Sequence, residues 1–192
     1  MAIVNNTKFY EEAVIKYGVS PRGVHWNSKQ TQEKRFEILL EFIKKDISNS
    51  SIIDAGCGFG DLIKYFSSNN LIPNKYLGLD AEYFYIEIAS NIYPNTNFMQ
   101  LDILEDELPM ADYYICSGAL NTLEFQEIQV FINKCFNASK KGFIFNFLKG
   151  KTFNGIKKEK LLEFCNKINT NNKIKENYLK NDFSVFMIKE NS

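Results

Sequence analysis

The chain has 192 residues, of which 45% are hydrophobic, and its 23 basic and 23 acidic side chains give a net charge of zero. This length and composition favour a single domain over residues 1–192 with a substantial buried core. There is no apolar run of about 18 residues and no basic-then-apolar leader, so we expect a cytoplasmic protein without membrane contact. The four cysteines are widely spaced and there is one histidine, which disfavours a zinc site or a disulfide framework, and we expect no metal.

The charges are unevenly distributed along the chain. Residues 1–133 carry 10 basic and 18 acidic side chains, whereas residues 134–192 carry 13 and 5. A basic C-terminal third is typical of proteins that contact RNA. Many of its lysines lie in a segment with helical periodicity, however, where they would form a solvated face. RNA is therefore an alternative partner and not the leading one.

An extension precedes the first predicted strand and contains an amphipathic helix. Apolar residues spaced between Phe36 and Ile47 share one helical face, which predicts packing on a sheet. Gln32 and Arg35 lie one helical turn apart, so both are candidates to face a bound ligand.

Residues 51–62, with the sequence SIIDAGCGFGDL, are the most informative segment. An apolar run ends at Asp54 and leads into alternate glycines, which predicts a strand, a tight turn and a helix that begins near Phe59. Such a turn lets a ligand approach the backbone and the free N–H groups of the helix start. A dinucleotide fingerprint needs its third glycine where this chain has Asp61, so the turn favours a ligand with a cationic group over a pyrophosphate.

Downstream, apolar runs alternate with helical patterns, which predicts an α/β fold with a Rossmann-like, doubly wound sheet. The last two predicted strands are joined by a short polar turn and must therefore be antiparallel. The segment at 51–54 and the later runs make seven strands, the later ones expected at 75–80, 96–103, 112–117, 141–148, 173–178 and 182–188.

The glycine turn resembles the first motif of the class I S-adenosylmethionine (SAM)-dependent methyltransferases, D-x-G-x-G-x-G, which is matched by Asp54, Gly56, Gly58 and Gly60. The resemblance implies the strand order 3-2-1-4-5-7-6 with a reversed last strand. It also implies an N-terminal helical lid at 1–48 on a SAM-binding core at 49–192. The expected cofactor is SAM, with S-adenosylhomocysteine (SAH) as the product.

Further cofactor contacts are expected at the ends of other strands. Asp80 lies 20 residues after Gly60, about the interval at which a carboxylate reaches ribose hydroxyls. The resemblance implies that Asp102 accepts a hydrogen bond from the adenine amino group, and Arg35 is a candidate to pair with the methionine carboxylate. The expected cofactor-binding residues are Arg35, Asp54, Ala55, Gly56, Cys57, Gly58, Gly60, Asp80, Ala81, Asp102, Ile103, Ser117 and Gly118.

The acceptor side of the site is expected beneath the N-terminal segment, which commonly covers the substrate pocket in this family. Tyr17 and Trp26 are therefore substrate-binding candidates. His25 is the one side chain whose usual pKa suits a general base. Asn121 and Asn146, near the ends of the fourth and fifth strands, are candidates to orient the acceptor. The family's Asp/Asn-Pro-Pro-aromatic motif and its metal-binding acid are absent, which disfavours those two subclasses.

The leading hypothesis is a metal-independent, SAM-dependent methyltransferase that acts on an oxygen or nitrogen atom of a small molecule. One alternative is an RNA methyltransferase that uses the basic C-terminal third. Another is a binding module that holds SAM or SAH without transferring the methyl group. A NAD-dependent oxidoreductase is disfavoured by Asp61, and no feature indicates an oligomeric state.

Overall fold

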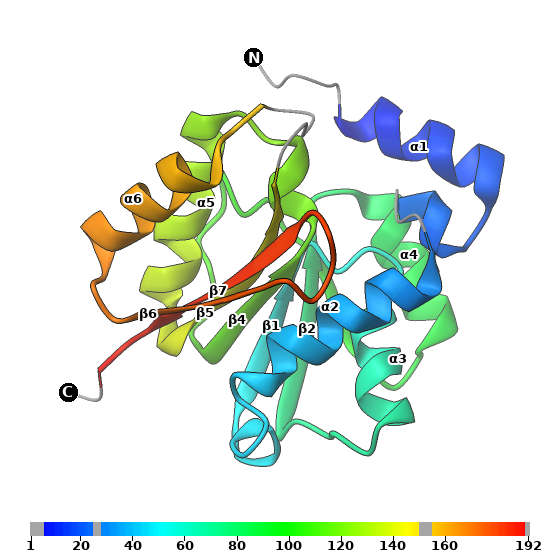
Figure 1. The fold of residues 1–192 in the computed structure, drawn as a ribbon. Coiled ribbons are helices and arrows are strands. Elements are labelled where there is room, and N and C mark those ends of the chain that lie inside the picture. The colour runs from blue at the N-terminus through cyan, green and yellow to red at the C-terminus, as the bar shows by residue number, and fades with distance from the viewer. Residues whose placement is uncertain (1–5, 25–27, 150–154, 191–192) are drawn as a thin grey trace.

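The computed structural model describes residues 6–24, 28–149 and 155–190, in which seven strands form one mixed sheet (Figure 1). The sheet order is β3-β2-β1-β4-β5-β7-β6, and β7 runs antiparallel to both of its neighbours. This confirms the predicted fold and the reversed last strand. The strands are β1 (Ser51–Ala55), β2 (Lys75–Asp80), β3 (Asn97–Gln100), β4 (Ala111–Ser117), β5 (Ser139–Leu148), β6 (Asn172–Glu176) and β7 (Asp182–Ile188).

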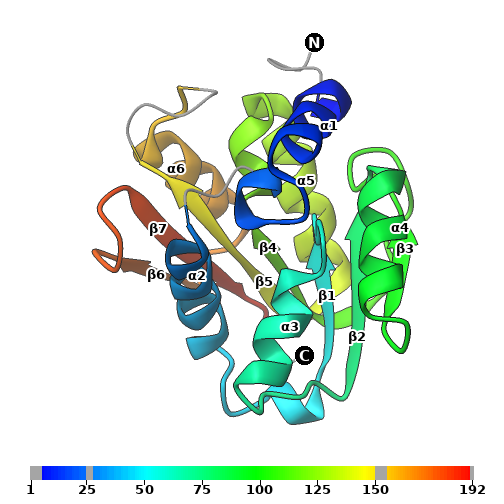
Figure 2. The ribbon, with the colours of Figure 1, turned by 90° about the vertical axis from the view of Figure 1, so that its right-hand side faces the viewer.

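Helices cover both faces of the sheet. Figures 1 and 2 show α2 and α3 on one face and α5 and α6 on the other, and α4 packs along β2 and β3. No helix in the described parts of the chain is long and apolar enough to cross a membrane. The helices are α1 (Asn6–Tyr17), α2 (Lys29–Glu41), α3 (Asp61–Ser68), α4 (Tyr83–Ile92), α5 (Phe125–Ala138) and α6 (Lys158–Ile168), with short 3-10 helices η1 (Pro21–Val24), η2 (Ile47–Asn49) and η3 (Ala119–Thr122).

Each face of the sheet has its own hydrophobic core. On β5, Phe143, Phe145 and Phe147 pack into the core under α5 and α6, whereas Ile144 packs into the core under α2 and α3. This alternation follows from the two-residue period of a strand. It also places Asn146, two residues after Ile144, on the α2 face.

The helix expected between Phe36 and Ile47 is displaced toward the N-terminus. The observed α2 begins after Ser28, whose hydroxyl oxygen accepts a hydrogen bond from the Thr31 N–H at 3.2 Å. This is an N-cap, a local signal for a helix start. The later apolar residues belong to a turn and to η2, whose Ile47 is buried in the same core.

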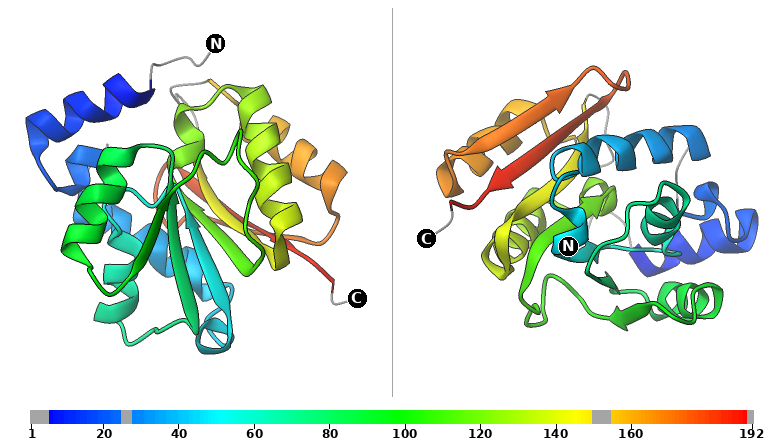
Figure 3. Two further views of the ribbon diagram at one scale, coloured as in Figure 1. Left: turned by 180° about the vertical axis from the view of Figure 1, so that it is seen from behind. Right: turned by 90° about the horizontal axis from the view of Figure 1, so that it is seen from below.

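The N-terminal elements lie over the edge of the sheet where the parallel strands end. Figure 1 shows α1 and η1 beyond the tips of these strands, and the view from behind in Figure 3 shows the same arrangement. The Tyr85 hydroxyl on α4 donates a hydrogen bond to the Gly23 carbonyl of η1 at 3.0 Å. This contact ties η1 to the edge at which a ligand is expected.

Candidate functional site

The turn after β1 has the shape that its glycines predict. Gly56, Gly58 and Gly60 have φ values of 81°, 52° and 78°, in the left-handed region that favours glycine. A Cβ atom on Gly56 would also lie 2.6 Å from the Ala119 Cβ. The Leu79 carbonyl holds the turn by accepting hydrogen bonds from two consecutive backbone N–H groups, at 2.8 and 2.9 Å.

Two carboxylates flank this turn: Asp54, which is buried, and Asp80, which is half-buried. Asp80, at the end of β2, accepts hydrogen bonds from the Gly58 N–H at 2.9 Å and the Glu82 N–H at 3.1 Å. Asp54, at the end of β1, accepts one from the Tyr76 hydroxyl at 2.8 Å. The adjacent parallel strands therefore bring both acids to one edge, as the positions of Asp54 and Asp80 in the sequence indicate.

Burial makes both acids easier to protonate. Burial, together with the neighbouring acids Asp80 and Asp61, raises the pKa of Asp54 to about 7, against the hydrogen bond from Tyr76. Burial likewise raises the pKa of Asp80 to about 6, against hydrogen bonds from backbone N–H groups. A cation bound between them would favour their charged forms. The geometry and the charge thus suit a cationic ligand.

A cavity of about 410 Å³ opens along this edge of the sheet. Its described lining contains six carboxylate side chains and no lysine, arginine or histidine. Cationic ligands are therefore favoured and anionic ones are disfavoured. The polar side chains that line it are Gln32, Asp54, Asp61, Asp80, Glu82, Tyr85, Asp102, Ser117, Asn121, Thr122 and Glu127.

Most of the sequence-predicted cofactor residues line this cavity, and three do not. Ala55 is fully buried in β1, Gly60 precedes α3 as its N-cap, and Arg35 points elsewhere. His25 and Trp26 lie outside the described residues. The residues that do line it are Asp54, Gly56, Cys57, Gly58, Asp80, Ala81, Asp102, Ile103, Ser117 and Gly118.

Arg35 has a structural partner in place of the expected cofactor carboxylate. Its guanidinium group forms a bidentate ion pair with Asp182 of β7, with Nη2 2.9 Å from Oδ2, and both side chains are buried. The two parallel N–H donors of the guanidinium group, which made Arg35 a candidate to bind a ligand carboxylate, are therefore used by Asp182. Arg35 thus does not belong to the proposed cofactor-binding residues.

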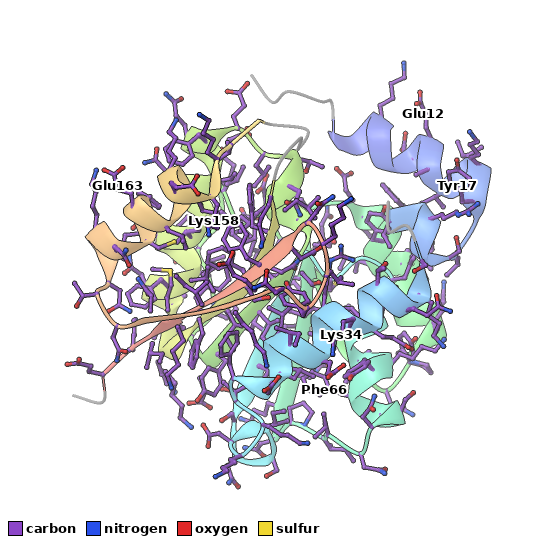
Figure 4. The ribbon with its side chains drawn as sticks, in the orientation of Figure 1. Glu12, Tyr17, Lys34, Phe66, Lys158 and Glu163 are labelled. Carbon is purple, nitrogen blue, oxygen red and sulfur yellow. The ribbon has the colours of Figure 1, made fainter. Side chains whose placement is uncertain are left out.

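Two acceptor-side candidates also have other positions or partners. The Asn121 side chain donates to the Gly118 carbonyl at 2.9 Å and accepts from the Leu148 N–H at 3.1 Å, so it joins η3 to the end of β5. Tyr17 lies at the outer end of α1, is 41% exposed and does not line the cavity (Figure 4). The Asn121 side chain thus holds η3 against the end of β5. Tyr17 is not part of the proposed substrate site.

Gln32, which the helical spacing marked as a candidate to face a ligand, lines the cavity, and it donates a hydrogen bond to Asp61 Oδ2 at 2.9 Å that joins α2 to the start of α3. The sequence interpretation missed several other lining residues. Glu82 follows Asp80 by two residues, a spacing that places a second acid at the same strand end. Phe36 and Glu127 carry no local signal, because they reach the cavity only through the packing of α2 and α5.

Comparison with known proteins agrees with this geometry. A family model for a methyltransferase domain matches residues 52–142. A protein of Invertebrate iridescent virus 6, provisionally named methyltransferase 235L, is 36% identical over 62 residues, which is 32% of this chain. That match spans 23% of the viral protein.

Solved structures of methyltransferases superpose on almost the whole chain. The magnesium protoporphyrin IX methyltransferase of Synechocystis, with bound SAH, has a TM-score of 0.70 at 14% identity and covers 96% of this chain and 95% of its own. A TehB-like SAM-dependent methyltransferase of Corynebacterium glutamicum has a TM-score of 0.68 at 16% identity and covers 95% and 99%. These likenesses establish the shared fold.

The chain therefore has the fold of SAM-dependent methyltransferases, and its residues 52–142 match a methyltransferase-domain family model. The expected cofactor, SAM, fits the acidic cavity and the glycine turn.

Proposed function

We propose that the chain transfers a methyl group from SAM to an oxygen or nitrogen atom of a small molecule without a metal ion. The observation that carries this proposal is the cavity itself, in which acids from three neighbouring strand ends meet the glycine turn. Among the described residues, no three histidine, cysteine or acidic side chains are grouped as metal ligands.

The proposed roles of the cofactor-binding residues follow from their positions. Asp54 would hold the methionine ammonium, Asp80 the ribose hydroxyls and Asp102 the adenine amino group, while the backbone at Gly56 and Gly58 allows close approach. The bound cofactor supplies an electrophilic methyl group on a cationic sulfur. The chain contributes orientation and the exclusion of water, which are the main requirements of such an in-line transfer.

The lysines of the C-terminal third favour a small molecule over RNA. Lys149 and Lys158 both pair with Glu176 at 3.1 Å, and Lys167 pairs with Glu163 at 2.8 Å. A phosphate backbone would also be repelled by the acids of the cavity.

Calorimetry with SAH tests the cofactor site. We expect wild-type protein to bind SAH with a dissociation constant on the order of micromolar, a free energy of about −8 kcal/mol. Asp80→Ala removes the carboxylate that holds the turn, and Gly58→Val places a branched side chain at φ 52° against Val24, so each should weaken binding at least tenfold. Glu87→Ala, an exposed change on α4, is the matched control. Absence of SAH binding by the wild type would overturn the proposal.

Turnover separates the enzyme from a binding module. Acceptor-dependent conversion of SAM to SAH, measured with a small-molecule extract and separately with total RNA, distinguishes the alternatives. Turnover with the extract alone supports the proposal. Turnover with RNA alone, abolished by substitution of Lys157, Lys158 and Lys160 with alanine, would replace it with the RNA alternative, and no turnover with either would favour a binding module.

A further inference from the structure

Three polar residues form a row across the end of the sheet on the α2 face. Ser117 of β4 is the register partner of Asn146 of β5, which in turn is opposite Ser184 of β7. The hydroxyl groups of Ser184 and Tyr178 lie 2.8 Å apart and are hydrogen-bonded. The hydroxyl group of Ser184 therefore has its hydrogen-bond partner within the protein.

The other two members of the row have unmatched hydrogen-bonding groups. Asn146 is fully buried, yet its Nδ2 and Oδ1 have no hydrogen-bond partner in the described part of the chain, and the same holds for the buried Ser117 Oγ. A buried carboxamide without partners is unfavourable, because it has lost its hydrogen bonds to water without replacement. An unexplained buried polar group of this kind indicates a missing partner.

Ser117 lines the cavity on the side away from the proposed nucleoside contacts, and Asn146, its register partner on β5, lies next to it outside the cavity lining. Ser117 lines the cavity directly, and so does Leu148, two residues after Asn146 on the same strand. Asp80 lies on β2, on the other side of β1, whereas β4 and β5 follow β1 in the opposite direction. Asn146 thus lies beside the part of the cavity that the cofactor contacts leave for an acceptor.

The chemistry of the row selects the kind of group that fits. A carboxamide offers a donor and an acceptor side by side, and a serine hydroxyl can act as either. A cation would leave the Asn146 Nδ2 without a partner, and an anion would leave no partner for its Oδ1 and would face the acids of the cavity. The complementary group is uncharged and carries a donor next to an acceptor.

We propose that the side chains of Ser117 and Asn146 form an acceptor-recognition subsite that takes an uncharged group of this type, such as a primary amide. This assignment rests on the proposed methyltransferase function and names the class of its substrate. Ser117, which the sequence marked as a cofactor contact, is assigned here to the acceptor instead, and together with Asn146 it would determine specificity, while Asp54, Asp80 and Asp102 hold the cofactor.

The test uses nuclear magnetic resonance on the ¹⁵N-labelled full chain saturated with SAH. The side-chain NH₂ signal of Asn146 is assigned by its loss in Asn146→Leu. Acetamide, acetate and ethylammonium, three probes of similar size, are then titrated separately. We expect acetamide to shift the Asn146 signal in a saturable manner, and the two charged probes to bind at least tenfold more weakly.

A pair of serine variants provides the matched comparison. Ser117→Ala should weaken acetamide binding at least threefold, because one hydrogen bond to the probe is lost. Ser139→Ala, at the opposite end of β5 where the hydroxyl donates to the Phe136 carbonyl, should leave acetamide binding unchanged. These serine variants keep the test valid if Asn146→Leu fails to fold, since Ser117→Ala then reports on the subsite through other shifted signals.

Each outcome decides one proposal. Equal shifts by all three probes would show a pocket without selectivity, and no shift by acetamide would show a pocket for water only; either result would overturn the subsite. SAH affinity is measured in the same samples, so a wild-type protein that binds SAH but does not discriminate the probes overturns the subsite alone. A wild-type protein that fails to bind SAH overturns the proposed function.

Discussion

The buried pair of Arg35 and Asp182 joins α2 to β7 across 147 positions of sequence. Removing one member of such a pair leaves an uncompensated buried charge, which typically lowers stability by about 3–5 kcal/mol. We therefore expect Arg35→Met to lower the free energy of unfolding by about this amount. Because Arg35 does not line the cavity, SAH affinity of the folded variant should be unchanged. Urea denaturation and calorimetry measure the two quantities.

Two further variants check this interpretation of Arg35. The double variant Arg35→Met/Asp182→Leu should recover most of the lost stability, since no charge is left buried alone. Lys34→Met, which breaks an exposed pair with Glu37, should change stability by no more than about 1 kcal/mol. A large loss of SAH affinity in Arg35→Met with little loss of stability would return Arg35 to the cofactor site.

The contrast between Arg35 and the three strand-end aspartates shows which site residues a sequence reveals. Asp54, Asp80 and Asp102 each follow an apolar run, so their shared edge can be inferred from local patterns. The partner of Arg35 lies on the last strand, and only the antiparallel position of β7 brings it beneath α2. Asn146 was selected by its place at a strand end, but its unmatched hydrogen-bonding atoms are visible only in the packed structure.

At the scale of elements, η1 is linked to α4 by a hydrogen bond from the Tyr85 hydroxyl to the Gly23 carbonyl. Val24 of η1 lines the cavity and lies against Gly58, so η1 closes part of the site. We expect Tyr85→Phe to loosen η1 and to raise the SAH dissociation rate severalfold. Stopped-flow displacement of bound SAH measures this rate.

Limited trypsin digestion gives a second readout of the same change. Cleavage after the exposed Arg22 should be faster in Tyr85→Phe than in the wild type, because local opening exposes the backbone of η1. Tyr83→Phe, two residues earlier and on the exposed side of α4, is the control and should change neither rate. Identical SAH dissociation and trypsin cleavage in Tyr85→Phe would show that packing alone holds η1.

The strands were predicted more accurately than the helices, for a physical reason. The central strands β1, β4, β5 and β7 are buried on both faces, so they form apolar runs that end abruptly at polar residues. The apolar pattern around α2 continues beyond Glu41 because Ile43 and Ile47 enter the same core from a turn and a 3-10 helix. The spacing of apolar residues reports which residues are buried, and on this segment burial continues beyond the end of α2.

For the whole molecule, the carboxylates divide into two groups with opposite effects on stability. A hydrogen bond from Lys141 lowers the pKa of the half-buried Asp46, and one from Lys149 lowers the pKa of Glu176. Such groups stabilise the fold above their unfolded pKa, and this contribution is lost in acid. Asp54 and Asp80, with pKa values raised by burial to about 7 and about 6, act in the reverse sense.

The stability of the ligand-free protein should therefore fall as pH rises from about 5 to about 7. In this range the folded state keeps protons on Asp54 and Asp80 that the unfolded chain has already released, and each group contributes up to about 1.4 kcal/mol per pH unit. The slope should be shallower in Asp54→Asn, which carries no titrating group there, and in wild type saturated with SAH, whose ammonium favours the charged carboxylate. Urea denaturation at pH 5, 6, 7 and 8 measures these slopes. Ligand-free stability that rises steadily from pH 5 to pH 7 would contradict the raised pKa values, and with them the account of how this cavity favours a cationic cofactor.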